Sequence, residues 1–247
     1  MKYLFLVVCV CGHAPVVFGQ INASIIFSHN DYLQKKPFHA AYNLGAGYIE
    51  ADVFAKDGKL MLAHTADEIE EKRTIDKLYL VPIREALTVT KNKARAFTFM
   101  IDLKTDGIQT LGLLVHQLER YPELTSSPYL TIAISGNVPD TSEWKNFPSY
   151  ITFDGRPNRH YAAQHLKRVS FISNNFRAYS QWDGDDHLPE PDKIRLKEVI
   201  AAVHAQGKKI RFWGAPDVPN AWKTLLELDV DILGTDHIED VAAFLKN

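Results

Sequence analysis

The chain has 247 residues, which suits one large domain or two small ones. Hydrophobic residues make up 46% of it, enough for a sizeable core. Charged residues are 23% and the formal net charge is −2, so the composition gives no general attraction for nucleic acid, and we expect no nucleic-acid partner.

The first segment in chain order is typical of a secretory signal peptide. Lys2 precedes a short apolar run over residues 3–10, and Gly19 offers a small residue for cleavage. The run is too short to span a bilayer comfortably. We expect a signal peptide over residues 1–19, cleavage near Gly19, and an exported protein that is periplasmic or secreted. A buried N-terminal strand or helix is the alternative.

Both cysteines, Cys9 and Cys11, lie in this segment. The mature chain would then contain no cysteine. That excludes a disulfide framework, a zinc–thiolate site and a cysteine nucleophile.

Short apolar, β-branched runs alternate with helical patterns along the rest of the chain. The expected strands are Ala23–His29, Tyr48–Phe54, Phe97–Lys104, Leu130–Ser135, Tyr150–Phe153, Val169–Ser173, Lys209–Trp213 and Asp231–Thr235. The expected helices are Pro37–Leu44, Pro82–Thr90, Ile108–Arg120, Glu143–Phe147, Ala162–Lys167, Pro191–Gln206, Asn220–Leu228 and Ile238–Lys246. Such alternation predicts parallel strands joined by crossover helices. Eight strands favour a single α/β domain over residues 20–247, a closed (β/α)8 TIM barrel, with a doubly wound open sheet as the alternative.

Polar residues gather where these strands end. They are His29, Glu50, Asp52, Asp102, Lys104, Ser135, Asp154, Asn174, Trp213 and Asp236. Catalytic groups of barrel enzymes sit at the carboxyl ends of the strands. A carboxylate inside a strand costs several kcal/mol unless it is paired or bound to a metal. We therefore expect the functional site at this end of the barrel.

Glu50 and Asp52 are two residues apart on an expected strand, so their side chains point to the same face. Two carboxylates held together repel each other unless a cation lies between them. Mg²⁺ and Ca²⁺ both prefer oxygen ligands. Asp102, on the next expected strand, can complete a three-carboxylate site for one divalent cation. The alternative is a set of rim carboxylates that form salt bridges.

Lys104 shares a face with Asp102 and lies one step nearer the mouth of the barrel, where it could hold an anionic substrate oxygen. An Asp102–Lys104 ion pair at the rim is the alternative. His29 ends the first strand, and His64 ends an apolar run after the second. Histidines can take or give a proton near neutral pH, so two of them beside a phosphodiester would supply base and acid. Each could also be an ordinary histidine.

Short motifs at characteristic positions carry a family resemblance. They are His29-Asn30-Asp31-Tyr32, Pro37, Ala41, Gly45, Glu50-Ala51-Asp52, Asp57-Gly58, His64 and the segment from Val230 to Asp236. Together they resemble the signature of the glycerophosphodiester phosphodiesterases. The form of residues 28–32, with Arg73-Thr74-Ile75 and Leu78-Tyr79-Leu80 before Pro82, is closer to the altered-inheritance-of-mitochondria branch and its bacterial relatives. The sphingomyelinase D enzymes of spider venoms have a similar arrangement of the residues that stand here as His29, Glu50, Asp52, His64, Asp102, Lys104 and Trp213.

The resemblance implies roles for seven residues. It implies a metal bound by Glu50, Asp52 and Asp102, and an acid–base pair of His29 and His64. It implies that Lys104 neutralises the phosphate and that Trp213 lines the substrate pocket. Asn30 stands where these phosphodiesterases usually carry arginine. As a substrate contact it lacks the bidentate phosphate interaction of a guanidinium, which puts simple glycerophosphodiesters in doubt.

The sequence thus predicts metal-dependent hydrolysis or cyclising cleavage of a glycerophosphodiester or phospholipid headgroup, with one divalent cation, Mg²⁺ or Ca²⁺. We expect a monomer that acts on a small-molecule or lipid phosphodiester and contacts a membrane transiently. A non-catalytic barrel that binds a phosphorylated headgroup is the alternative. A glycosidase is disfavoured, because Glu50 and Asp52 lie on one strand, whereas glycosidase carboxylates straddle the sugar at about 5 Å or more.

Overall fold

The computed structural model describes residues 23–89 and 94–246, so the expected signal peptide lies outside the described residues. Eight parallel strands form a ring in the spatial order β8, β7, β6, β5, β4, β2, β1, β9. The bounds of these strands are β1 (Ile26–Ser28), β2 (Tyr48–Lys56), β4 (Phe97–Leu103), β5 (Leu130–Gly136), β6 (Ile151–Gly155), β7 (Val169–Asn175), β8 (Ile210–Trp213) and β9 (Leu233–Thr235).

The ring is nearly closed. β9 pairs with β1 in parallel, with Ile26 opposite Leu233. Between β8 and β9 an isolated parallel bridge joins Arg211 to Ile232, and the Ile232 backbone N–H donates to the carbonyl of Ile210 at 3.2 Å. This architecture confirms the expected TIM-like barrel and not the open sheet.

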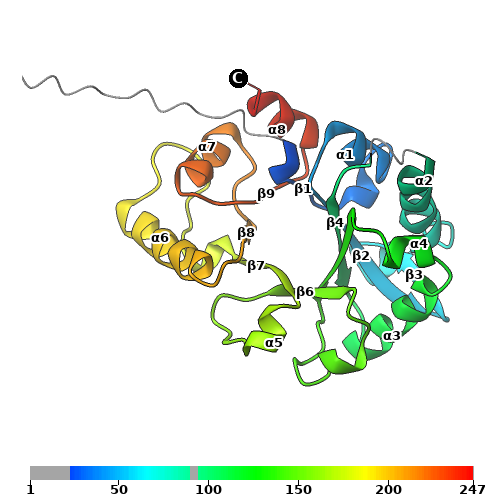
Figure 1. Ribbon diagram of the computed structural model, residues 1–247. Coiled ribbons are helices and arrows are strands. Elements are labelled where there is room, and N and C mark those ends of the chain that lie inside the picture. The colour runs from blue at the N-terminus through cyan, green and yellow to red at the C-terminus, as the bar shows by residue number, and fades with distance from the viewer. Residues whose placement is uncertain (1–22, 90–93, 247) are drawn as a thin grey trace, which may run out of the picture.

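Helices cover the outside of the ring (Figure 1). They are α1 (His39–Leu44), α2 (Val81–Val89), α3 (Gly107–Leu118), α4 (Pro122–Thr125), α5 (Ala163–Leu166), α6 (Glu190–His204), α7 (Pro219–Glu227) and α8 (Ile238–Phe244). The expected helix at Glu143–Phe147 is only a short 3-10 turn, Trp144–Asn146. Within the described ranges, no helix has the length and apolar character needed to cross a bilayer.

Two local elements differ from the expectation. The first expected strand begins later, because Ala23–Ile25 is a 3-10 turn and not extended chain. The apolar run before His64 is a strand of its own, β3 (Lys59–Leu62), which pairs antiparallel with the end of β2. Asp57 and Gly58 both have positive φ and form the tight turn between the two strands, as an Asp-Gly hairpin requires. This hairpin carries His64 back to the mouth of the barrel.

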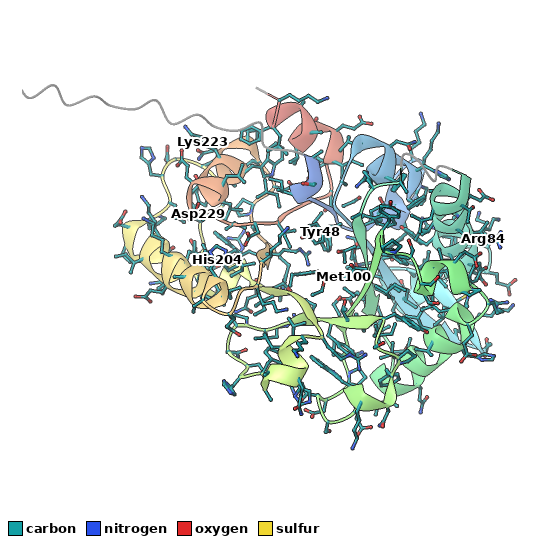
Figure 2. The ribbon with its side chains drawn as sticks, viewed as in Figure 1. Tyr48, Arg84, Met100, His204, Lys223 and Asp229 are labelled. Atoms are coloured by element: carbon teal, nitrogen blue, oxygen red, sulfur yellow. The ribbon has the colours of Figure 1, made fainter. Side chains whose placement is uncertain are left out.

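The barrel has two separate apolar cores. The inner one consists of Phe27, Tyr48, Met100, Ala133, Phe171 and Ile232. Figure 2 shows Tyr48 and Met100 at the centre of the ring, whereas Arg84 and His204 lie outside it. The larger core lies between the strands and the surrounding helices. Because successive strand residues alternate between these two cores, polar residues in phase with the inner core must face the barrel axis.

Strand register determines which polar residues meet. Asp52 on β2 lies opposite Asp102 on β4, and Asp102 lies opposite Ser135 on β5. Glu50 lies opposite Met100, a member of the inner core. The carboxylates therefore stand in the barrel interior directly above the inner apolar core.

A buried carboxylate, Asp31, holds the loop that follows β1. It accepts hydrogen bonds from the Ser28 hydroxyl at 2.8 Å, the Phe38 backbone N–H at 2.6 Å and the Tyr79 hydroxyl at 2.9 Å. Burial raises the pKa of Asp31, although these hydrogen bonds act in the opposite direction. The contacts join β1, the start of α1 and the turn before α2, and so fix the backbone that carries His29.

Asp31→Ala should lower the free energy of unfolding by about 2 to 3 kcal/mol, because it leaves the buried Phe38 N–H and Tyr79 hydroxyl without their acceptor. Thermal or urea denaturation measures the change. Glu198→Ala, on the exposed face of α6, is the matched control and should change stability little. Equal stability of the Asp31 variant and the control would contradict this role.

Candidate active site

A cavity of about 440 Å³ opens at the carboxyl end of the barrel. Seven of the eight residues singled out in the sequence line it: His29, Glu50, Asp52, His64, Asp102, Lys104 and Trp213. The other lining residues are Met100, Ser135, Gly136, Asp154, Arg156 and Arg211. Strands from all around the barrel thus contribute to one site.

The three carboxylates form a compact oxygen cluster. Glu50, Asp52 and Asp102 each offer an oxygen that lies within 4.8 Å of the others. Metal–oxygen distances of about 2.0 to 2.6 Å place ligands on opposite sides of Mg²⁺ or Ca²⁺ about 4 to 5 Å apart. The cluster therefore fits a single hard divalent cation, in both spacing and ligand type.

Glu50 shows why the cluster needs positive charge. Its side chain is 2% exposed, and its pKa is raised well above the usual value, first by burial and then by the nearby charge of Asp52. The Asn30 backbone N–H donates to Glu50 Oε2 at 2.7 Å and acts in the opposite direction. A bound cation would stabilise the charged form of all three carboxylates together.

Lys104 lies against two of these carboxylates. Its Nζ is 2.9 Å from Asp52 Oδ1 and 3.0 Å from Asp102 Oδ1. Burial lowers the pKa of Lys104, but the carboxylates outweigh burial and raise it. The ion pair with Asp102, which the sequence left as an alternative, is present and extends to Asp52. Ser135 supports the same group by donating to Asp102 Oδ2 at 2.8 Å.

His64 is oriented by the cluster itself. Its Nδ1 is 3.0 Å from Asp52 Oδ2. Because a carboxylate only accepts hydrogen bonds, Nδ1 is the donor, which leaves Nε2 for another partner. Tyr32 donates its hydroxyl to the same carboxylate oxygen at 3.0 Å.

His29 is oriented by Asp236, which follows β9, the strand that pairs with β1. Its Nδ1 is 2.9 Å from Asp236 Oδ1, and this hydrogen bond lowers the pKa of Asp236. Asp236 is positioned in turn by Asp217, whose Oδ2 accepts from the Asp236 backbone N–H and the Thr235 hydroxyl. Both candidate histidines thus have Nδ1 bound to a carboxylate and Nε2 left for a ligand, an arrangement that suits proton transfer.

Asn30 differs from the other predicted residues in its position. It adopts the left-handed conformation, with φ 47°, which asparagine tolerates better than most residues. Its side-chain oxygen accepts from the Tyr32 hydroxyl at 3.1 Å. Asn30 lines a neighbouring cavity together with Leu33 and His64, outside the main one. Its contact with a substrate stays a prediction, whereas its backbone contact with Glu50 is part of the site.

Sequence reasoning missed Arg211, Asp217 and Tyr32 as site residues. The sequence did contain a signal for Arg211. It is two residues from Trp213 on a short apolar strand, so both side chains point to the same face, and a buried charge there needs a partner or a ligand just as a buried carboxylate does. Asp217 lies in a loop, where no pattern marks it. Trp213, which the sequence did single out, is 42% exposed at the mouth.

Solved structures share this fold. A glycerophosphodiester phosphodiesterase from Parabacteroides distasonis superposes with a TM-score of 0.57 at 13% identity, over 91% of this chain and 97% of that one. An Oleispira antarctica phosphodiesterase in complex with the product sn-glycerol-3-phosphate gives 0.59 at 13% identity, over 90% and 96%. A putative glycerophosphoryl diester phosphodiesterase from Agrobacterium tumefaciens gives 0.54 at 17% identity, over 89% and 96%. At these identities the likeness shows the TIM-like fold.

Sequence relatives define the family. Residues 16–138 match the AIM6-like phosphodiesterase domain. Altered inheritance of mitochondria protein 6 of Saccharomyces cerevisiae (strain YJM789) is 26% identical over 267 residues, covering 87% of this chain and 68% of that protein. The homolog from Arthroderma benhamiae is 30% identical over 257 residues, covering 86% and 81%. The chain therefore belongs to the AIM6-like phosphodiesterase family.

Proposed function

We propose that this protein cleaves the phosphodiester of a glycerophosphodiester or phospholipid headgroup, using one Mg²⁺ or Ca²⁺ and a pair of histidines. The observation that carries the proposal is the placement of three carboxylates and two oriented imidazoles around one cavity. Each imidazole has Nδ1 held by a carboxylate, so Nε2 can exchange a proton with a ligand. The family supports phosphodiester cleavage as the general reaction, and the geometry of the site supports the roles proposed for the histidines and carboxylates.

Proton transfer is divided between the two histidines. His29 takes a proton from the nucleophile, and Asp236 stabilises the imidazolium that results. His64 gives a proton to the leaving oxygen, with Asp52 holding its ring in place. Glu50, Asp52 and Asp102 would hold the divalent cation, which when bound supplies positive charge to a phosphate oxygen in the transition state. Lys104 adds a further positive charge next to these carboxylates.

Two exposed apolar side chains near the cavity support a lipid-related substrate. Leu33 is 60% exposed in the turn after β1, and Trp213 is 42% exposed at the end of β8. A phosphate bound between the histidines would bring its attached alcohol toward this apolar rim. We also propose that the monomer contacts a membrane transiently through these exposed side chains.

Removal of one proposed metal ligand, the carboxylate of Glu50, should abolish the stabilisation of the protein by metal. Mg²⁺ or Ca²⁺ at about 100 times its dissociation constant should stabilise the wild-type protein by about 2.7 kcal/mol. Glu50→Gln keeps an acceptor for the Asn30 N–H but loses the negative charge, so its melting temperature should not rise with metal. Glu198→Gln on α6 should respond like the wild type. Metal titrations followed by thermal denaturation test this, and an unchanged response in Glu50→Gln would contradict the ligand assignment.

Loss of either imidazole should slow the chemical step. His29→Ala and His64→Ala should each lower kcat by about two to four orders of magnitude, measured with bis(p-nitrophenyl) phosphate in the presence of metal. His204→Ala is the control, because His204 pairs with Asp231 outside the barrel. Full activity of both active-site variants would contradict the acid–base assignment. An inactive wild-type protein that still binds metal would favour the non-catalytic, ligand-binding barrel.

The substrate class is best tested by phosphorus NMR on glycerophosphodiesters, lysophospholipids and phosphoinositides. Attack by water gives a linear phosphomonoester, whereas attack by a neighbouring hydroxyl of the substrate gives a cyclic phosphate first. We expect turnover of at least one headgroup diester, with the His29 and His64 variants inactive on the same compound. Turnover of none of these diesters by the metal-loaded protein would count against the proposed function.

A further inference from the structure

The side chain of Arg211 lies inside the barrel. It is 4% exposed on β8, and its guanidinium carbon is 3.6 Å from the centroid of the Phe27 ring. Gly234 on β9 makes room for it, since a Cβ at that position would lie 3.3 Å from Arg211 Nε. The guanidinium thus packs between the ring of Phe27 and the backbone at Gly234. Neither of these groups can form an ion pair with it.

Arg211 differs from the other cations of the cavity in its partners. Lys104 contacts Asp52 and Asp102, and Arg156 contacts Asp154. Within the described chain Arg211 forms no salt bridge, and its Nε is buried without a hydrogen-bond partner. Its charge is balanced only at longer range, by the carboxylates of Asp154, Glu50 and Asp102, and burial outweighs them and lowers the pKa of Arg211.

The position of Arg211 relates it to the proposed base. It lines the main cavity and also a smaller one of about 140 Å³ beside it. These two cavities share three residues, His29, Arg211 and Trp213. A group bound where they meet would therefore lie next to His29, with Trp213 at the entrance.

The charges of the main cavity fit an anion at this point. Its lining contains four carboxylates and three cations, which gives a formal charge of −1 with neutral histidines. A divalent cation on the carboxylate cluster changes this to +1. A phosphodiester carries one negative charge, so its binding would neutralise the metal-loaded site.

We propose that Arg211 binds the phosphate of the substrate, donating its N–H groups to a phosphate oxygen from the wall opposite the carboxylate cluster. This role deepens the proposed function and rests on it for the identity of the reacting phosphate. The chemistry recognised is the oxyanion of a phosphate ester. A guanidinium suits it because its N–H groups match phosphate geometry and its charge is permanent.

The test compares Arg211→Met with the wild type by calorimetric titration of the Mg²⁺-loaded proteins with sn-glycerol 3-phosphate and with inorganic phosphate. Loss of charge-assisted hydrogen bonds should weaken the binding of both probes by about 10- to 100-fold. Affinity is the readout that decides, because loss of the guanidinium also takes a positive charge away from the buried Asp154 and so lowers the melting temperature in either case. A purely structural arginine would give an unchanged affinity for both probes.

Arg168→Met is the matched control. Arg168 also lies over an aromatic ring, that of Phe153, but it donates to the backbone carbonyls of Pro148 and Ile151. This variant should melt at a lower temperature and bind both probes as tightly as the wild type. The conservative Arg211→Lys should lose part of the affinity, and it decides the question if Arg211→Met does not fold.

Wild-type affinity for both probes in the folded Arg211 variants would overturn the proposal. This affinity measurement does not depend on whether the protein cleaves a phosphodiester. If the wild type binds the probes through Arg211 but cleaves no phosphodiester, the phosphate-binding role stands and the proposed function fails. If it cleaves phosphodiesters with an unchanged affinity in the variants, the proposed function stands and the role of Arg211 fails.

Discussion

Mutual repulsion among Glu50, Asp52 and Asp102 is the constraint on which the site depends. Parallel pairing of β2 and β4 in one fixed register brings these side chains together above an apolar core, where their charges are poorly screened. The neighbouring groups respond to this concentration of negative charge. Lys104 bridges two of the carboxylates, the Asn30 backbone N–H donates to Glu50, and the Ser135 hydroxyl donates to Asp102. A divalent cation together with Lys104 would balance the three negative charges.

The scaffold around the cluster is specialised to hold it. Asp31 fixes the loop after β1, and the left-handed conformation of Asn30 places its backbone N–H against Glu50. Gly136, at φ 72°, ends β5 beside Asp102, and a Cβ there would lie 2.5 Å from Asp102 Oδ1. A larger residue at that position would displace the carboxylate, so the geometry of the cluster depends on the shape of the backbone. Such local departures from regular geometry are common where a fold carries a functional site.

The barrel and the carboxylate cluster were predictable because both follow from short-range patterns. Strand alternation places Glu50 and Asp52 on one face, and parallel pairing places Asp102 beside them. Contacts between distant segments could not be derived in this way. His29 and Asp236 are 207 residues apart and meet only because β9 pairs with β1. The antiparallel β3 had a local signal in Asp57-Gly58, but periodicity alone does not separate a hairpin strand from a loop.

Charge balance relates the two sides of the cavity, the carboxylate cluster on β2 and β4 and Arg211 on β8. The carboxylate cluster could hold a cation, and a divalent cation there would leave the cavity, which Arg211 also lines, with a formal excess of positive charge. Asn30 provides no guanidinium next to the first histidine. Of the two arginines in the described lining, Arg156 forms a salt bridge with Asp154, whereas Arg211 on β8 forms none. Binding of metal and phosphate should therefore be cooperative, since each neutralises charge that the other leaves uncompensated.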